Sequence, residues 1–240
     1  MFDTAQKQGL HLSNLRYSHR GADLIDIEDL QLGSSGVTVI MGPNGAGKSL
    51  LLRLIHGLLP PTSGNIRYDG QRFSPDVSRQ QALVFQTPVL LRRTVEANLR
   101  FVLKIRGLPE DRVDPLLRSV GLADKHRTPA RRLSGGERQR LAIAQAMATE
   151  PKHLSLDEPT ASLDPASVLA IEKIVADVAA RGVRIVFVTH DAGQARRLAD
   201  DVVFMSNGQV VEHTPASHFF ETPETQTAQD YLAGRLTPEV

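Results

Sequence analysis

Residues Gly42-Pro43-Asn44-Gly45-Ala46-Gly47-Lys48-Ser49 match the phosphate-binding pattern G-x-x-x-x-G-K-[ST]. They follow the β-branched run Val37–Met41, which predicts a buried strand, and precede a helical pattern that starts at Leu51. In this context the glycines let backbone N–H groups turn toward phosphate oxygens, and the helix N-terminus adds partial positive charge. We expect Lys48 to reach the β- and γ-phosphates and Ser49 to bind Mg²⁺. The alternative is a glycine-rich turn that only caps a helix, and the flanking pattern disfavours it.

Length and composition are typical of a soluble enzyme with one globular domain. The 240 residues are 41% hydrophobic and 23% charged, which is enough for a large core. The formal charge of +1 gives no strong attraction to nucleic acid or to an anionic lipid surface. The absence of cysteine excludes disulfides, thiolate metal sites and cysteine nucleophiles. With no signal pattern and no apolar run of about 20 residues, we expect a cytosolic chain that needs a partner for any role at a membrane.

Strand patterns predict an α/β fold with two kinds of sheet. Apolar and polar residues alternate over Leu10–Tyr17 and Leu24–Leu32, which predicts an N-terminal antiparallel β layer. Apolar runs at Val37–Met41, Leu154–Asp157 and Ile185–Thr189 are separated by helical patterns, so we expect them to form a parallel sheet.

Helical spacing dominates residues 87–150, where strand patterns disappear, and this predicts an inserted helical lobe. Val202–Met205 and Gln209–Glu212, joined by Asn207-Gly208, predict a closing hairpin followed by at most two short helices. We therefore expect a single domain over residues 1–240. Residues 1–86 and 151–240 would form its core with the β layer, and residues 87–150 the helical lobe.

A second chemical site is predicted where the run His153–Asp157 ends in the adjacent carboxylates of Asp157 and Glu158. Ligands of α/β sheets bind at strand ends, and neighbouring strand side chains point to opposite faces. Asp157 can then hold Mg²⁺ while Glu158 orients or deprotonates an attacking water. The alternative is a solvated acidic strand end before Pro159, and the phosphate-binding pattern upstream favours the functional interpretation.

Leu133-Ser134-Gly135-Gly136-Glu137 precedes a helical run of small residues. Ser134 and Glu137 have the spacing of a capping box, which alone could explain both residues. A capping box does not require Gly135 and Gly136, however. Their absent side chains would let backbone N–H groups approach an anion at another helix N-terminus. We therefore expect a second surface that faces a phosphate.

In this order, Gly42–Ser49, Leu133–Glu137, Leu154–Glu158 and His190 resemble the nucleotide-binding subunit of an ABC transporter, and the resemblance covers nearly the whole chain. It implies the P-loop NTPase core of an ABC ATPase, with ATP and Mg²⁺ as cofactors. Two positions depart from the family pattern. Glu137 stands where Gln is most frequent and keeps the capping acceptor. Ser155 interrupts an aliphatic strand and suggests a wetter strand face.

The resemblance also assigns roles to single residues. The expected catalytic residues are Glu158, His190 and Lys48, where His190 contacts the γ-phosphate. The expected metal ligands are Ser49, Gln86 and Asp157, and Gln86 would also link Mg²⁺ to a membrane partner. The expected nucleotide-binding residues are Tyr17, which stacks on adenine, Gly42, Pro43, Asn44, Gly45, Ala46, Gly47, Lys48, Ser49, Leu50, Gln86, Ser134, Gly135, Gly136, Glu137 and Asp164. Each of Tyr17, Gln86 and His190 alone also fits an ordinary strand-end or loop residue, and the ordered set favours the functional roles.

The mechanism implied by the resemblance is a head-to-tail homodimer. ATP lies between Gly42–Ser49 of one subunit and Ser134–Glu137 of the other, and Asp164 lies in the segment Ser162-Leu163-Asp164 that crosses the interface. The helical lobe, with Gln86 at its hinge, passes motion to an integral membrane permease at the cytoplasmic face of the membrane. The permease implies in turn an extracytoplasmic solute-binding protein. No nucleic-acid partner is expected.

The segments Gln86–Val95, Val102–Gly107 and Ala192–Asp200 resemble importers of oxyanions of the tungstate type. Importers of phosphate, molybdate or amino acids remain alternatives, because the transported solute does not touch this subunit. Two other classes also remain open. One is an ABC-type ATPase that acts on DNA or ribosomes, although the chain has neither a long coiled-coil insertion nor a second cassette. The other is a P-loop kinase, which would need neither Leu133–Glu137 nor His190.

Overall fold

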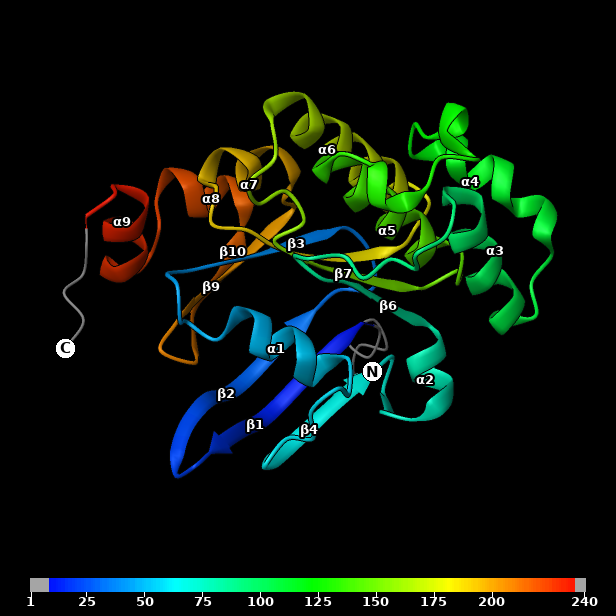
Figure 1. Ribbon diagram of the computed structural model, residues 1–240. Helices are drawn as coiled ribbons and strands as arrows, with labels where there is room; N and C mark the ends of the chain where they lie inside the picture. The colour runs from blue at the N-terminus through cyan, green and yellow to red at the C-terminus, as the bar shows by residue number, and fades with distance from the viewer. Residues whose placement is uncertain (1–8, 236–240) are drawn as a thin grey trace.

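In the computed structural model, which describes residues 9–235, two β-sheets enclose helix α1 (Figure 1). The smaller sheet has the strand order β2-β1-β4-β5 and the larger one β10-β9-β3-β8-β7-β6. The strands are β1 (Leu10–His19), β2 (Ala22–Leu32), β3 (Val37–Met41), β4 (Ser63–Tyr68), β5 (Gln71–Arg72), β6 (Gln81–Val84), β7 (His153–Asp157), β8 (Arg184–Val188), β9 (Asp201–Ser206) and β10 (Gln209–Pro215). The predicted α/β fold with an antiparallel β layer is confirmed.

Strand directions in the two sheets follow the sequence patterns. In the smaller sheet all pairs are antiparallel, and β1 pairs with β2 from Leu10↔Leu32 to His19↔Ala22. In the larger sheet β6, β7, β8, β3 and β9 are parallel, and β10 alone pairs antiparallel, with β9. The hairpin turn lies at Asn207 and Gly208, whose φ angles of 49° and 78° are those that an Asn-Gly turn requires.

Helices cover both faces of the larger sheet. In Figure 1, α1 lies between the sheets, while α6, α7 and α8 lie on the opposite face and α3 and α4 at one end. The helices are α1 (Lys48–Ile55), α2 (Pro75–Arg79), α3 (Val95–Arg106), α4 (Val113–Ser119), α5 (Gly135–Met147), α6 (Pro165–Ala179), α7 (Ala192–Leu198), α8 (Ala216–Glu221) and α9 (Gln226–Leu232). The last two are the short helices expected after the hairpin.

The core has two parts, which meet at the larger sheet. Val39 and Met41 of β3 belong to the upper cluster, which includes residues of α3, α5 and α6. Ile40 belongs to a second cluster, with α1 and the antiparallel sheet. Neighbouring strand residues point to opposite faces, so one buried strand serves both clusters. The helical segment 87–150 shares the upper cluster, because Leu99 and Leu141 pack in it with Leu154 of β7. Its helices are therefore packed directly against the sheet.

Two details of the larger sheet differ from the sequence interpretation. The strand β6 was not predicted, because it has four residues and begins with the polar Gln81. Ser155 does not make its strand face wet, since it is only 2% exposed and lies between Leu83 of β6 and Val186 of β8.

Candidate functional site

The loop 42–47 joins the end of β3 to the start of α1. Gly42 has a φ of 144°, and a Cβ atom at this position would lie 2.0 Å from the carbonyl oxygen of Met205. Gly47, with a φ of 96°, is the N-cap of α1. Within the loop, the Ala46 N–H donates to the carbonyl of Pro43 at 3.2 Å, and Asn44 and Gly45 between them are exposed. Positive φ angles at the glycines thus shape the turn, as the motif predicts.

Lys48 is buried beside this loop. Its Nζ atom donates to the carbonyl oxygens of Gly42 and Pro43, at 2.8 Å each, and the residue is 6% exposed. Burial lowers the pKa of the Lys48 ammonium, while the nearby carboxylates of Glu158 and Asp157 act in the opposite direction. The carbonyl groups of the loop thus hold the Lys48 ammonium at the base of the glycine-rich turn, close to the carboxylates of Asp157 and Glu158.

Ser49 and Asp157 are joined across two elements, since the Ser49 hydroxyl donates to Asp157 Oδ1 at 2.8 Å. Burial raises the pKa of the Asp157 carboxyl, and the hydrogen bond from Ser49 opposes that shift. A hydroxyl and a carboxylate are the hard oxygen donors that Mg²⁺ prefers, with the remaining ligands supplied by water and phosphate. The donors therefore fit Mg²⁺ bound together with a nucleotide. In residues 9–235 no cluster of three or more His, Asp or Glu side chains could hold a metal alone.

Glu158 and His190 face each other at the neighbouring strand ends. His190 Nδ1 lies 3.3 Å from Glu158 Oε2, and the exposed fractions of the two side chains are 59% and 19%. Glu158 has a φ of 44°, an uncommon value for a residue with a side chain, and its N–H donates to the Val188 carbonyl at 3.1 Å. The strained backbone turns the carboxylate of Glu158 toward the end of β8.

The adjacent strands β3, β8 and β7 therefore deliver one part of the site each: Lys48 and Ser49 follow β3, His190 follows β8, and Asp157 and Glu158 end β7. The carboxyl ends of parallel strands form the edge at which α/β sheets bind ligands. The loop with Lys48, the Ser49–Asp157 pair and the Glu158–His190 pair are together at this edge. Such an arrangement can bind a polyphosphate with Mg²⁺ and position a water molecule.

Ser134 and Glu137 form the predicted capping box. The Glu137 N–H donates to the Ser134 hydroxyl at 3.2 Å, and the Ser134 N–H donates to Glu137 Oε2 at 2.8 Å. The N–H of Ser134 lowers the pKa of the Glu137 carboxyl. Gly136 has an internal packing role that was not foreseen, because an added Cβ atom would lie 2.3 Å from the Ser167 hydroxyl on α6. Gly135 is partly exposed and lies against Leu163.

The remaining predicted residues, apart from Leu50, lie on other elements. No hydrogen bond or ion pair among the described residues joins Ser134–Glu137 to the phosphate loop. Tyr17 is half-buried near the end of β1, and Gln86 is exposed two residues after β6. Asp164 caps α6, since its carboxylate accepts from the N–H and the hydroxyl of Ser167 at 2.9 and 2.6 Å. These two bonds lower the pKa of Asp164. Leu50 lies in the first turn of α1.

Two residues at the site were missed by sequence reasoning. The Tyr231 hydroxyl on α9 donates to the carbonyl of His190 at 3.3 Å, and its ring packs against Phe204 at 5.1 Å between centroids. Gln194 on α7 accepts a hydrogen bond from Thr160 at 2.9 Å. Gln194 lies within the segment Ala192–Asp200, but its contact with Thr160 and the contact of Tyr231 with His190 depend on helix packing that local patterns do not indicate.

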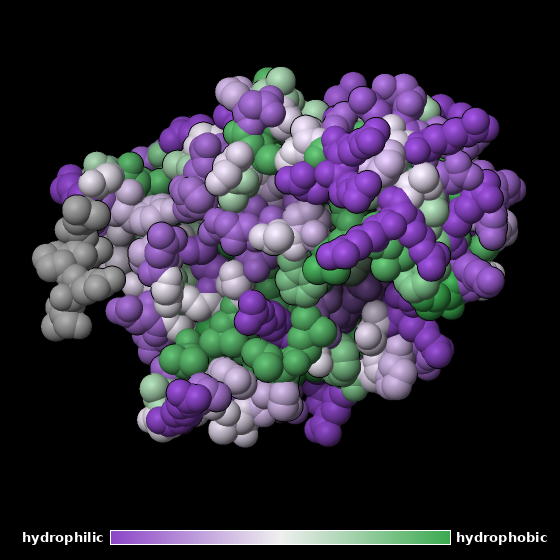
Figure 2. All heavy atoms as spheres, in the orientation of Figure 1, coloured by the Kyte–Doolittle hydropathy of each residue, from purple (hydrophilic) through white to green (hydrophobic). Residues whose placement is uncertain are grey.

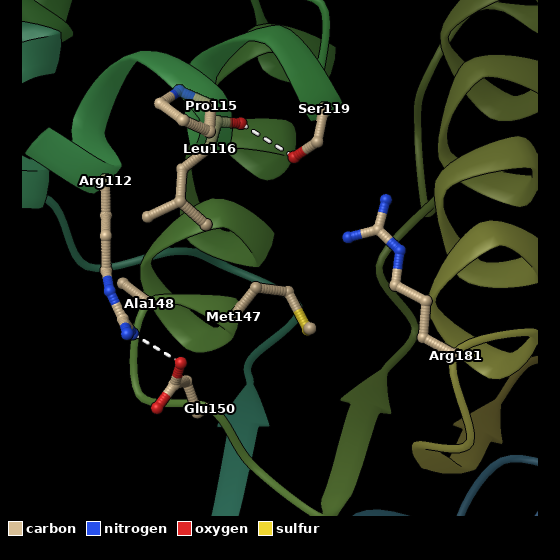
Figure 3. Close-up of a pocket in the computed structure, with 8 residues that line it drawn as sticks. All are labelled: Arg112, Pro115, Leu116, Ser119, Met147, Ala148, Glu150 and Arg181. Carbon is tan, nitrogen blue, oxygen red and sulfur yellow. Dashed lines mark hydrogen bonds and ion pairs between the residues drawn. The ribbon is translucent and has the colours of Figure 1, made fainter.

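A cavity of about 370 Å³ lies elsewhere, between α4, the end of α5 and Arg181 (Figure 3). Figure 3 shows Arg112 paired with Glu150 at one side and the Arg181 guanidinium at the other. No predicted nucleotide-binding residue lines this cavity. None of the helices in residues 9–235 combines the length and hydrophobicity that a membrane crossing requires.

Comparison with known proteins gives the family. The family profile described as ABC transporter matches residues 26–161. The tungstate uptake system ATP-binding protein TupC of Peptoclostridium acidaminophilum is 41% identical over 206 residues, which cover 84% of this chain and 96% of that protein. The phosphate import ATP-binding protein PstB 2 of Natronomonas pharaonis is 35% identical, with 98% and 89% covered. The methionine import ATP-binding protein MetN of Escherichia coli K12 is 36% identical, with 95% and 71% covered.

Solved structures agree with the sequence relatives. The structure of cbiO1 from Clostridium perfringens, part of the ABC transporter complex cbiONQ, matches with a TM-score of 0.82 and 31% identity, covering 90% of this chain and 91% of that chain. An ATP-binding subunit of an ABC transporter matches with a TM-score of 0.80 and 27% identity, covering 95% and 99%. The chain therefore belongs to the ABC transporter family and is an ATPase with the fold of that family's ATP-binding subunits.

Proposed function

We propose that this ATPase works as a homodimer that energises an importer of a small solute, most simply an oxyanion such as tungstate. The observation that carries the proposal is the convergence of Lys48, Ser49, Asp157, Glu158 and His190 at the ends of three adjacent strands. This set contains the groups that phosphoryl transfer from Mg·ATP to water requires: fixed positive charge, magnesium donors and a carboxylate that positions water.

Binding is assigned to the loop and its neighbours. Backbone N–H groups of residues 42–49 and the N-terminus of α1 bind the phosphates, while Lys48 exchanges its bonds to the loop carbonyls for bonds to phosphate oxygens. Ser49 and Asp157 hold Mg²⁺, which supplies neutralising charge to the β- and γ-phosphates when bound. Tyr17, half-buried at the rim of the antiparallel sheet, stacks on adenine.

Hydrolysis is assigned to Glu158 and His190. The Glu158 carboxylate orients the attacking water and accepts its proton, and His190 contacts the γ-phosphate. The 3.3 Å separation of Nδ1 and Oε2 lets the two groups position each other. Exposure of His190 leaves its imidazole free to turn toward the nucleotide.

A second copy completes the site. Ser134 is exposed and Gly135 partly exposed, and in the described part of the chain neither forms a hydrogen bond with the phosphate loop. The N-terminus of α5 can therefore serve a nucleotide bound by another subunit, where it adds a second source of partial positive charge. Asp164 caps the neighbouring α6 and lies on the same surface, since Gly136 packs against Ser167. Closure of the two subunits would exclude water from the phosphates.

A permease partner is supported by exposed apolar side chains on α3 and in the segment between Gln86 and α3. Val89 is 85% exposed, and Phe101 and Ile105, one turn apart on α3, are 40% and 66% exposed. Figure 2 shows a small hydrophobic area among polar side chains at the α3 end of the molecule, and a larger one in the region of α1 and the antiparallel sheet. Exposed apolar patches of this kind mark protein interaction sites. We assign this surface to a helix of an integral membrane permease at the cytoplasmic face of the membrane, with a solute-binding protein on its far side.

Tungstate is favoured over other solutes by the TupC relative, which this chain matches over 96% of that protein's length. Phosphate, molybdate and amino acids such as methionine are the alternatives, and phosphate and methionine import proteins are among the relatives. An ABC ATPase without a transport role is the alternative from another class.

Reconstitution with the permease tests this proposal. The chain would be purified with a co-expressed permease and solute-binding protein, placed in vesicles, and supplied with ATP and one solute at a time. We expect tungstate to raise ATP hydrolysis and to be taken up. Stimulation by phosphate or methionine instead would select the alternative, and failure to bind any permease would exclude the importer role.

A further inference from the structure

Two polar side chains join the segments that follow β7 and β8, behind the Glu158–His190 pair. The Thr160 hydroxyl donates to the Gln194 side-chain oxygen at 2.9 Å. The Gln194 side-chain nitrogen donates to Glu172 at 3.1 Å, and Gln194 is only 1% exposed. Thr160 lies two residues after Glu158, and Gln194 lies four residues after His190. The two segments are therefore connected twice, by the Glu158–His190 pair at the site and by the Thr160–Gln194 hydrogen bond in the interior.

Gln194 is fixed on the α7 side. Its backbone N–H donates at 2.8 Å to the carboxylate of Asp191, the N-cap of α7. The Glu172 carboxylate that accepts from Gln194 also accepts two bonds from Arg197, at 2.9 and 2.7 Å. Unpaired buried amide groups are costly, so these bonds determine the orientation of the Gln194 side chain. His190 is the residue directly before Asp191, and a fixed α7 N-terminus therefore fixes its backbone.

Thr160 is also connected, through Leu163, to Gly135 at the N-terminus of α5. The N–H of Leu163 donates to the Thr160 carbonyl at 3.2 Å. Leu163 in turn lies against Gly135, where an added Cβ atom would be 3.1 Å from the leucine side chain. A continuous set of contacts thus leads from the N-terminus of α5 through Thr160 and Gln194 to the His190 segment.

We propose that Gln194 is a positioning residue which, through Thr160, couples the surface around Gly135 and Leu163 to the placement of His190 beside Glu158. The inference rests on the proposed function, which assigns that surface to the second subunit and hydrolysis to Glu158 and His190. Engagement of the partner subunit then places the carboxylate and the imidazole for hydrolysis. Binding of ATP to the phosphate loop does not depend on this contact.

Two substitutions at Thr160 in the full chain separate hydrogen bonding from packing. Thr160→Val keeps the shape and removes the hydroxyl, whereas Thr160→Ser keeps the hydroxyl and removes the methyl group. We expect Thr160→Val to lower kcat about tenfold with a KM for ATP within about twofold of wild type. Thr160→Ser should keep kcat within about twofold of wild type. Three results would each overturn the inference. These are a lower kcat in Thr160→Ser with a normal kcat in Thr160→Val, equal changes of kcat in the two variants, and a change in KM alone.

A double-mutant cycle with His190→Ala tests whether Thr160 acts through His190. Single-turnover hydrolysis with protein in excess keeps slow variants measurable. If the coupling exists, Thr160→Val slows hydrolysis much less in the His190→Ala background than in wild type. The same tenfold loss in both backgrounds would overturn it. If His190→Ala alone keeps the wild-type rate, the assigned role of His190 fails. If His190→Ala is slow and Thr160→Val is normal, only the coupling fails.

Discussion

At the scale of single residues, the proposed hydrolysis depends on the Glu158 carboxylate and binding depends on Lys48, Ser49 and Asp157. Glu158→Gln should therefore bind ATP and lose nearly all turnover, because the amide cannot accept the proton of the attacking water. Phosphate release measured at saturating ATP checks this. The same exchange at Glu221, exposed at the end of α8, is the matched control and should keep the wild-type rate. Normal turnover in Glu158→Gln would remove Glu158 from the catalytic residues.

The residues assigned to ATP binding give a second prediction at the scale of single residues. Lys48→Ala should weaken ATP binding strongly, because the phosphates lose their one buried point charge. Tyr17→Ala should weaken it by roughly 1–3 kcal/mol, the range for a base stacked on an aromatic ring. Tyr17→Phe retains the ring and should restore most of the affinity. Calorimetric titration with ATP measures all three. Unchanged affinity in Tyr17→Ala would show that Tyr17 serves only the antiparallel sheet.

At the scale of elements, the end of α1 packs on β4 and β7 through polar groups. Burial lowers the pKa of His56, the C-cap of α1, to about 4, and the charge of His153 acts in the same direction. Well above pH 6.5, His56 is neutral in both the folded and the unfolded state. As the pH falls from about 6.5 to 4, the unfolded state binds the proton first. The free energy of unfolding should then fall by at most about 3 kcal/mol.

Urea unfolding of wild type and His56→Gln between pH 7 and 4.5 measures this dependence. The variant should show a shallower loss of stability over that range. His19→Gln, a change at the exposed end of β1, controls for the loss of one histidine. Parallel curves for wild type and His56→Gln would show that acid destabilisation arises from other groups.

The junction between β6 and α3 is the element assigned to transmission. Gln86→Ala should leave the chain folded and able to bind ATP, because Gln86 is exposed and outside the phosphate loop. In the assembled transporter we expect solute uptake to fall further than ATP hydrolysis, since the contact to the permease is weakened. Gln71→Ala, on the exposed edge strand β5, is the control. Equal losses of uptake and hydrolysis would indicate a role in catalysis or folding instead.

Elements with a local chemical cause were predictable from the sequence. The capping box at Ser134 and Glu137 and the turn at Asn207 and Gly208 depend on neighbouring residues alone. The strand β6 was not predictable, because four residues carry too little periodicity. The packing of Gly136 against Ser167 on α6 was not predictable either. That contact joins residues 31 positions apart in sequence, where local patterns carry no information.

At the scale of the whole molecule, local motifs predicted some residues of the site, whereas the contacts of others depend on the fold. Motifs predicted Lys48, Ser49 and Asp157, and the structure brings them together through the parallel order of the strands. The contacts of Gln194 and Tyr231 depend on how α7 and α9 pack, which only the fold determines. The proposed second subunit would contact an exposed face of this chain, which includes Ser134 and Asp164.

Dimer formation is therefore the claim that most needs a direct measurement. Glu158→Gln would be examined by light scattering during gel filtration, with and without saturating Mg·ATP. The account predicts a mass near 26.3 kDa without nucleotide and twice that with ATP, because bound and unhydrolysed ATP holds two subunits together. A mass that stays near 26.3 kDa, while calorimetry on the same sample shows ATP bound, would contradict a site shared between two subunits.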